Sequence, residues 1–249
     1  MLDLPIEDLI SVLFIMIAVV LTFVISLKSF KSYRANKVTL TVIIAVSSFF
    51  VALAMIFLTL EKAFFTATLP IFNTDLGMLC GAIAIVVSGA AVLAFCIFAY
   101  EMAFPKKTKI LGILSAFPII IYLGFWLLDP TRTISSIPPY EIIFGQLFGL
   151  SFEFTPTLSY FTLVPLFSVP IIILFYFAMK VRKESGLKSK RAAGLGIGGL
   201  ALASAYIAEI IGLDPTSPLI IIIIVLSRAL FIVAGAFFYW ALFRLKSKE

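Results

Sequence analysis

The sequence contains no histidine, and this absence excludes several kinds of site at once. Haem held between two histidines, copper or zinc held by imidazole, and a proton relay through histidine all need a side chain that the chain lacks. The last apolar stretch, residues 218–243, has no lysine to which a retinal Schiff base could attach. The Pro-Gln pair typical of seven-helix carriers is also missing. We therefore expect no metal site and no cofactor.

Charge is scarce as well, since 13% of the 249 residues are charged whereas 62% are hydrophobic, with a mean hydropathy of +1.18. A soluble domain of this length has no interior large enough for so much apolar surface. Helical runs of about 18–25 apolar residues are long enough to cross roughly 30 Å of hydrocarbon. The seven such runs are residues 9–27, 38–60, 76–100, 109–128, 157–179, 192–212 and 218–243. The sequence predicts an all-α membrane protein, a single seven-transmembrane helix bundle covering residues 1–249.

Most lysine and arginine residues fall in alternate connections between these runs. Four lie in LKSFKSYRANK after the first run, three in PKKTK after the third, six in KVRKESGLKSKR after the fifth and three in RLKSKE after the seventh. The other connections hold only Lys62 and Arg132. Because cytoplasmic loops retain basic residues, the pattern predicts a multi-pass protein of the cytoplasmic membrane with its N-terminus outside and its C-terminus inside. This topology accounts for the net charge of +6, and no nucleic-acid partner is expected.

The sixth run is rich in small residues, as in AAGLGIGGLALASA at residues 192–205. Small side chains let membrane helices approach closely, so we expect this helix at the centre of the bundle. GLGIGG also matches the G-x-G-x-x-G pattern of dinucleotide sites, but no strand precedes it. Cys80 and Cys96 lie sixteen residues apart in one run, too far along a single helix to form a disulfide.

Three ionisable residues lie within or at the edge of the apolar runs: Glu61, Glu209 and Arg228. A charge near the bilayer centre costs about 2.5–3.5 kcal/mol, which makes each of them a candidate functional residue. Ser217 is a plausible N-cap and Pro218 suits the first helical position. Arg228 then lies ten residues, about 15 Å, below the outer end of its helix.

Arg228 and Glu209 are the first-choice ion pair. Side chains lean towards the N-terminus of their own helix, so the arginine leans outward and the carboxylates on ascending helices lean inward. The short connection GLDPTSP makes the sixth and seventh helices antiparallel neighbours, and Glu61 is the second candidate partner. Two interpretations remain open. The pair is a structural lock on helix register, or Arg228 is the floor of an outward-opening pocket between the second, third, sixth and seventh helices that binds an anionic ligand group.

The connection at residues 129–156 is the only long one. Its segment YEIIFGQLFGLSFEF is too apolar for a solvated loop, and its two glycines favour a short β-hairpin or an interfacial segment. We expect this segment to lie on the bundle as a lid. The alternative is a surface that binds a partner protein.

Three short segments carry a family resemblance: LTLEKAF at 58–64, FAYEMAF at 98–104 and LLDPTRTI at 127–134. Together with seven spans and an outer N-terminus, they resemble the N-terminal seven-helix sensor region of membrane histidine kinases. The resemblance places Glu61 at that family's aliphatic-Glu position and implies that the protein senses a ligand. The sequence departs from the family after the fourth run, where no histidine follows Thr131, and we expect no kinase domain after FRLKSKE.

The function we expect is that of a stand-alone, receptor-like membrane sensor. It would bind a small anionic or lipidic ligand from outside and signal through a separate cytoplasmic or membrane protein. One alternative is a non-catalytic subunit of a larger membrane complex, and another is a small transporter gated by Glu209 and Arg228. An enzyme is not expected, because the chain shows no serine with a base and no paired membrane aspartates.

Overall fold

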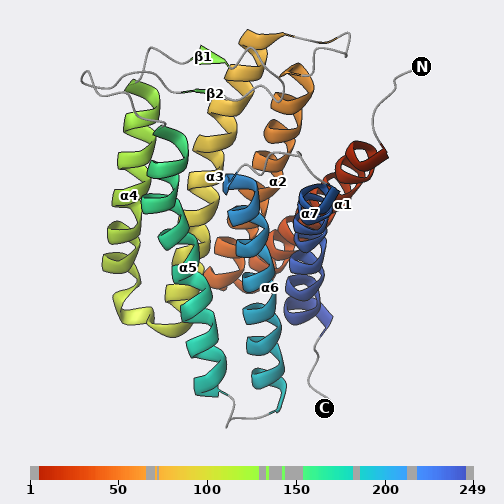
Figure 1. Cartoon of the computed structure of the whole chain (residues 1–249). Helices are drawn as coiled ribbons and strands as arrows, with labels where there is room; N and C mark the ends of the chain where they lie inside the picture. The colour runs from red at the N-terminus through yellow and green to blue at the C-terminus, as the bar shows by residue number, and fades with distance from the viewer. Residues whose placement is uncertain are drawn as a thin grey trace.

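The computed structural model of the chain describes residues 6–65, 71, 73–128, 133–134, 142–143, 154–181, 186–211 and 218–244. Seven α-helices account for nearly all of these residues (Figure 1). They are α1 (Ile6–Asn36), α2 (Thr39–Phe65), α3 (Thr74–Ala103), α4 (Thr108–Leu128), α5 (Phe154–Val181), α6 (Gly186–Ile211) and α7 (Pro218–Tyr239). A single 3₁₀ turn, η1 (Pro105–Lys107), precedes α4, and a π-helical turn, η2 (Trp240–Arg244), follows α7.

Six of the helices form a closed ring in the order α1, α2, α3, α5, α6 and α7, because α7 packs back against α1. The remaining helix, α4, lies outside this ring against α3 and α5 (Figure 1). This arrangement brings the first and last helices together although they are far apart in the sequence.

Each predicted apolar run overlaps one of the seven helices, but several helices are longer than the runs. The first run was bounded at residue 27 by its basic residues, whereas α1 continues to Asn36; likewise α6 begins at Gly186 instead of residue 192. The helical prediction was too short there because an α-helix satisfies its backbone hydrogen bonds internally whether its side chains are apolar or basic. Beyond Asn36, Lys37 adopts a left-handed conformation (φ 56°), and its N–H donates to the Tyr33 carbonyl at 2.7 Å.

The described residues include four helical segments long and apolar enough to cross a membrane: Val12–Asn36, Thr39–Glu61, Asp75–Ala103 and Val225–Arg244. Their length and composition indicate a helical multi-pass membrane protein. Their outward faces agree with this, since large apolar side chains such as Val20 and Leu226 are more than half exposed and would contact lipid.

Glycines permit close helix contacts at several positions in the ring. A Cβ atom at Gly198 of α6 would lie 3.2 Å from the Ala234 carbonyl oxygen of α7, and one at Gly235 of α7 would lie 2.6 Å from Leu21 of α1.

The small-residue helix α6 does not have the central position that the sequence predicted. α6 packs between α5 and α7 and turns Ile197 outward, whereas α3 contacts α2, α4 and α5.

Two short strands, β1 (Thr133–Ile134) and β2 (Ile142–Ile143), pair in an antiparallel manner with Thr133 opposite Ile143. The hairpin predicted across the two glycines of the segment at 140–154 falls mostly outside the described residues, although β2 at the start of that segment pairs with β1, which precedes it in the sequence. Residues 144–153 lie outside the described residues, so the lid remains a prediction.

Candidate functional site

A small cavity lies inside the helix ring, between α1, α2 and α3 on one side and α6 and α7 on the other. Its volume is about 30 Å³, which is enough for one water molecule and far smaller than an ordinary ligand pocket. The lining residues are Thr22, Ile25, Ile44, Ser47, Ser48, Val51, Met55, Phe95, Leu202, Phe231, Ala234, Gly235 and Phe238.

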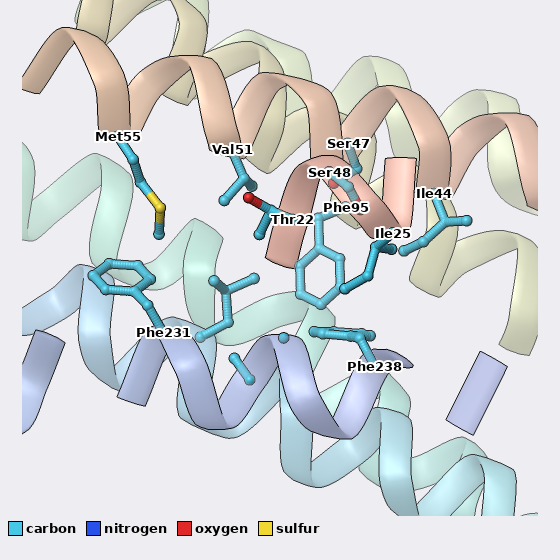
Figure 2. Close-up of a pocket in the computed structure, with 13 residues that line it drawn as sticks. Thr22, Ile25, Ile44, Ser47, Ser48, Val51, Met55, Phe95, Phe231 and Phe238 are labelled. Atoms are coloured by element: carbon cyan, nitrogen blue, oxygen red, sulfur yellow. The ribbon is translucent and has the colours of Figure 1, made fainter. Parts of the chain in front are cut away.

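Large apolar side chains form most of the cavity wall. Phe231 and Phe238 of α7 face α2 across the cavity, and Phe95 of α3 closes the space beside them (Figure 2). The Phe95 and Phe238 rings meet edge to face, with centroids 5.6 Å apart and an interplanar angle of 81°. Neither phenyl ring carries a hydrogen-bonding group, so this contact between α3 and α7 consists of van der Waals and aromatic packing.

Hydroxyl groups supply the polar part of the wall. Thr22 donates to the Ala18 and Val19 carbonyl oxygens of its own helix at 2.8 and 2.9 Å, and Ser47 donates across to Ala91 of α3 at 3.4 Å. Because each hydroxyl oxygen can also accept, Thr22 and Ser47 can still accept a hydrogen bond from a water molecule in the cavity. One helix turn from Thr22, Ser26 donates to the Ala45 carbonyl oxygen of α2 at 2.8 Å and ties α1 to α2.

Arg228 lies near the middle of α7, which begins at Pro218 as the capping pattern predicted. Its side chain is half-buried, between the buried neighbours Ser227 and Phe231, and it takes part in interactions within the molecule. Arg228 does not line the cavity, whereas Phe231, less than one turn further along α7, does. It therefore lies between the cavity and the end of the bundle at which α7 begins, and is not part of the cavity floor.

Glu61 lies near the end of α2 and is directed at α3. A Cβ atom at Gly81 would lie 2.8 Å from Glu61 Cδ, so the carboxylate occupies the space that the missing side chain leaves. The family resemblance drew attention to Glu61, but the sequence does not reveal this contact, since Gly81 is twenty residues away in the chain.

Glu209 belongs to α6, and α6 packs against α7 as predicted for neighbouring helices. Its side chain lies outside the described residues, so the pairing of Arg228 with Glu209 stays a prediction. Within the described part of the chain, no group of three histidine, cysteine, aspartate or glutamate side chains is placed to hold a metal ion.

Sequence reasoning did not identify the cavity. Its one sequence signal is the presence of hydroxyl residues inside apolar helices: Thr22 in α1, and Ser47 and Ser48 in α2. Ser and Thr are common in membrane helices for many reasons, so the pattern alone does not predict a void.

Comparison of the chain with models of protein families, with curated proteins and with solved structures finds no significant match in any of the three.

Proposed function

We propose that the protein is a stand-alone sensor of the cytoplasmic membrane, with seven spans and its N-terminus outside. It binds a small anionic or lipidic ligand from the outer side, and a movement of α7 against α1 and α2 passes the signal to a separate protein. The observation that carries the proposal is the cavity between the first three and the last two helices, with Arg228 less than one turn from its Phe231 wall.

The distribution of charge supports this orientation. Basic residues gather at the end of the bundle where α1 and α7 end and α6 begins, including Lys28, Lys31, Arg34, Lys106, Lys107, Lys109, Lys180, Lys188, Lys190, Arg191 and Arg244. A cytoplasmic face enriched in Lys and Arg is the usual arrangement. The outer half then contains Glu61 and Arg228.

The cavity supports movement of α7 in particular. A packed interface has few alternative arrangements, whereas a void beside the Phe231 and Phe238 rings lowers the cost of shifting the helix that carries them. An anionic group bound at Arg228 would act on that same helix. A ligand shifts the equilibrium between two positions of α7 only if it binds one of them more tightly. The proposal therefore requires that the guanidinium of Arg228 is more accessible to the ligand in one position of α7 than in the other.

The glycine contacts favour a sensor over a subunit of a larger complex. In α6, Gly194 is covered by η2, Gly198 by α7, and Gly199 by Leu174 and Phe95. At these three glycines, the close approach that small residues permit is therefore used by neighbouring segments of the same chain.

The test is the effect of carboxylates on thermal unfolding of the purified protein in detergent. Decanoate should raise the unfolding temperature of the wild-type protein, whereas decanol, which has the same chain length without the charge, should not. A ligand at about a hundred times its Kd stabilises by about 2.7 kcal/mol. Arg228→Ala should abolish the difference between decanoate and decanol, and Arg228→Lys should retain part of it.

Arg34→Ala is the matched control, because Arg34 is an exposed arginine at the opposite end of the bundle. It should respond to decanoate as the wild-type protein does. An equal response of the wild-type protein and of Arg228→Ala, in a variant that still unfolds cooperatively, would contradict the proposed site.

A further inference from the structure

A basic and aromatic cluster joins the first and last helices at the end of the bundle away from Arg228. Lys28 of α1 donates a hydrogen bond to the hydroxyl of Tyr239 of α7, with 2.5 Å between Nζ and Oη. The same ammonium lies 4.6 Å from the centroid of the Tyr239 ring and 5.9 Å from that of Phe243. The two rings lie 5.5 Å apart. Lys28 is therefore held in one place by aromatic groups, unlike a freely solvated lysine.

The backbone of this cluster is unusual, because Trp240–Arg244 is wound as a π-helix. A π-helical turn bonds i to i+5 and is wider than an α-helical turn, so Arg244 is rotated back towards the side of Tyr239, five residues earlier. Arg244 accordingly lies close enough to act on the Tyr239 hydroxyl together with Lys28. Such turns are rare and occur mostly at functional sites.

A contact with α6 fixes the opposite side of the π-helical turn. A Cβ atom at Gly194 would lie 3.0 Å from both the Trp240 ring and the Ala241 Cβ. Ala241 is fully buried, whereas Trp240 is partly exposed. The turn is thus anchored on α6 while its other side presents Tyr239, Phe243 and Arg244 next to Lys28.

Two basic side chains, Lys28 and Arg244, lie next to the hydroxyl group of Tyr239 in this cluster. The carboxylate side chains that the structure describes are those of Glu61, Asp75 and Glu101. Glu61 and Asp75 lie towards the other end of the bundle, and Glu101 belongs to α3, across the ring from α7. Within the described residues the cluster therefore combines concentrated positive charge with a hydroxyl, and the Tyr239 O–H remains able to donate while its oxygen accepts from Lys28.

We propose that Lys28, Tyr239 and Arg244 bind the phosphate of an anionic lipid headgroup between α1 and α7. An ammonium and a guanidinium make charge-assisted hydrogen bonds to phosphate oxygens, and the tyrosine hydroxyl adds a third donor. Trp240 is partly exposed at the same end of the bundle, and tryptophan is enriched where membrane helices meet the headgroups. The proposal rests on this end of the bundle facing the inner leaflet, and it does not depend on a ligand at Arg228.

A bound lipid phosphate would also link three helices, since it would bridge α1 and α7 at the turn that is anchored on α6. The lipid would thus stabilise one arrangement of α7 at the end where a partner protein would receive the signal. The inner leaflet supplies anionic lipid at its surface, and each basic side chain near that surface contributes about a fivefold gain in affinity.

The experiment uses the full-length protein with Trp126→Phe, which leaves Trp240 as the only tryptophan. The protein is placed in nanodiscs of phosphatidylcholine with increasing phosphatidylglycerol, and Trp240 fluorescence is recorded. We expect a saturable change that needs about five times more phosphatidylglycerol in Lys28→Gln, with a smaller shift in Tyr239→Phe, and the unfolding temperature of each variant in phosphatidylcholine checks that it is folded.

Arg34→Gln is the matched control, since Arg34 is an exposed cation on the same helix whose guanidinium lies over Phe30 instead, 5.9 Å from the ring centroid. It should shift the midpoint by less than about twofold. Equal shifts in Lys28→Gln and Arg34→Gln would overturn the site in favour of general surface charge. A saturable response to inorganic phosphate in pure phosphatidylcholine discs would overturn the lipid as ligand. Because decanoate is absent throughout, failure here is separate from failure of the proposed sensor.

Discussion

The helices α3 and α4 are both apolar along nearly their whole length, yet they occupy opposite kinds of position. The buried face of α3 consists largely of small side chains, with Ala84, Cys96 and Ala99 completely inaccessible. α4 instead directs large side chains away from the protein, and Ile113 is 72% exposed and Phe117 67% exposed. α3 contacts three other helices and α4 only borders the ring.

This difference shows that hydrophobicity alone does not separate inside from outside in the bundle, since equally apolar helices occupy both positions. Lipid chains are as apolar as leucine, so there is no hydrophobic gain in burying a large side chain between helices. Small residues instead allow backbones to approach and to gain van der Waals contact. Large side chains are therefore free to face lipid, as they do on α4.

The largest expected effect separates two phenylalanines, one on each helix. Phe98 of α3 is 2% exposed and belongs to a core cluster with Phe95, Leu174 and Phe238. Phe98→Ala should lower the free energy of unfolding by about 3 kcal/mol, the low end for such a truncation, because the lost contacts leave a cavity. Titration with sodium dodecyl sulfate, followed by circular dichroism, measures this change.

Phe117→Ala is the control for that measurement and should stay within about 0.5 kcal/mol of the wild-type protein. Phe117 is directed outward, so lipid or detergent replaces its ring without leaving a void. Similar losses in the two variants would mean that α4 is covered by protein, which would contradict the comparison between the two helices.

Replacing a glycine by alanine should have a smaller effect on the free energy of unfolding, and the sign of the effect should differ between α3 and α4. Gly81→Ala on α3 places a Cβ atom against the Glu61 carboxylate, and we expect a loss of about 1–2 kcal/mol. Gly112→Ala on α4 meets only Ile97 at 3.4 Å and should be neutral or stabilise by about 0.5 kcal/mol, because alanine favours the helix.

A double-mutant cycle isolates the cause of the loss at Gly81. In a Glu61→Ala background the added methyl group has nothing to displace, so Gly81→Ala should cost much less there than in the wild-type protein. A loss of the same size in both backgrounds would show that a neighbour other than Glu61 limits the space.

The smallest effect concerns the hydrogen bond between the two helices. The Tyr100 hydroxyl of α3 and the Ser115 hydroxyl of α4 lie 2.5 Å apart in a buried position. Tyr100→Phe should lower the free energy of unfolding by about 0.6 kcal/mol, a usual value for such bonds in membrane proteins. Ser115→Ala should have a similar effect, and the double variant should cost less than the sum if the two hydroxyls bond to each other.

Much of the fold follows from the sequence, because hydropathy and helix length are local properties. The seven apolar runs each overlap a helix, and the proline at position 218 correctly predicted the start of α7. The end of α1 at Asn36 and the start of α6 at Gly186 were not predicted, because basic segments continue a helix as readily as apolar ones. The central position predicted for the small-residue helix was wrong because glycines mark close contact without saying on how many sides.

The candidate site was less predictable. A charge in a hydrophobic run identified Arg228 as a residue to consider, but not its distance from the cavity. The contact between Glu61 and Gly81, and that between Lys28 and Tyr239, join residues that are distant in the sequence. No local pattern contains such information, because it depends on how helices are rotated about their own axes.

The sequence by itself determined the membrane environment and the helical segments, since these follow from the free energy of placing each stretch of chain in hydrocarbon. The closure of the ring through α1 and α7, the exclusion of α4 from it and the void beside Phe231 were decided by tertiary structure alone. The physical reason is that in lipid every helix is already in an apolar solvent, so only the shapes of facing side chains select which helices meet.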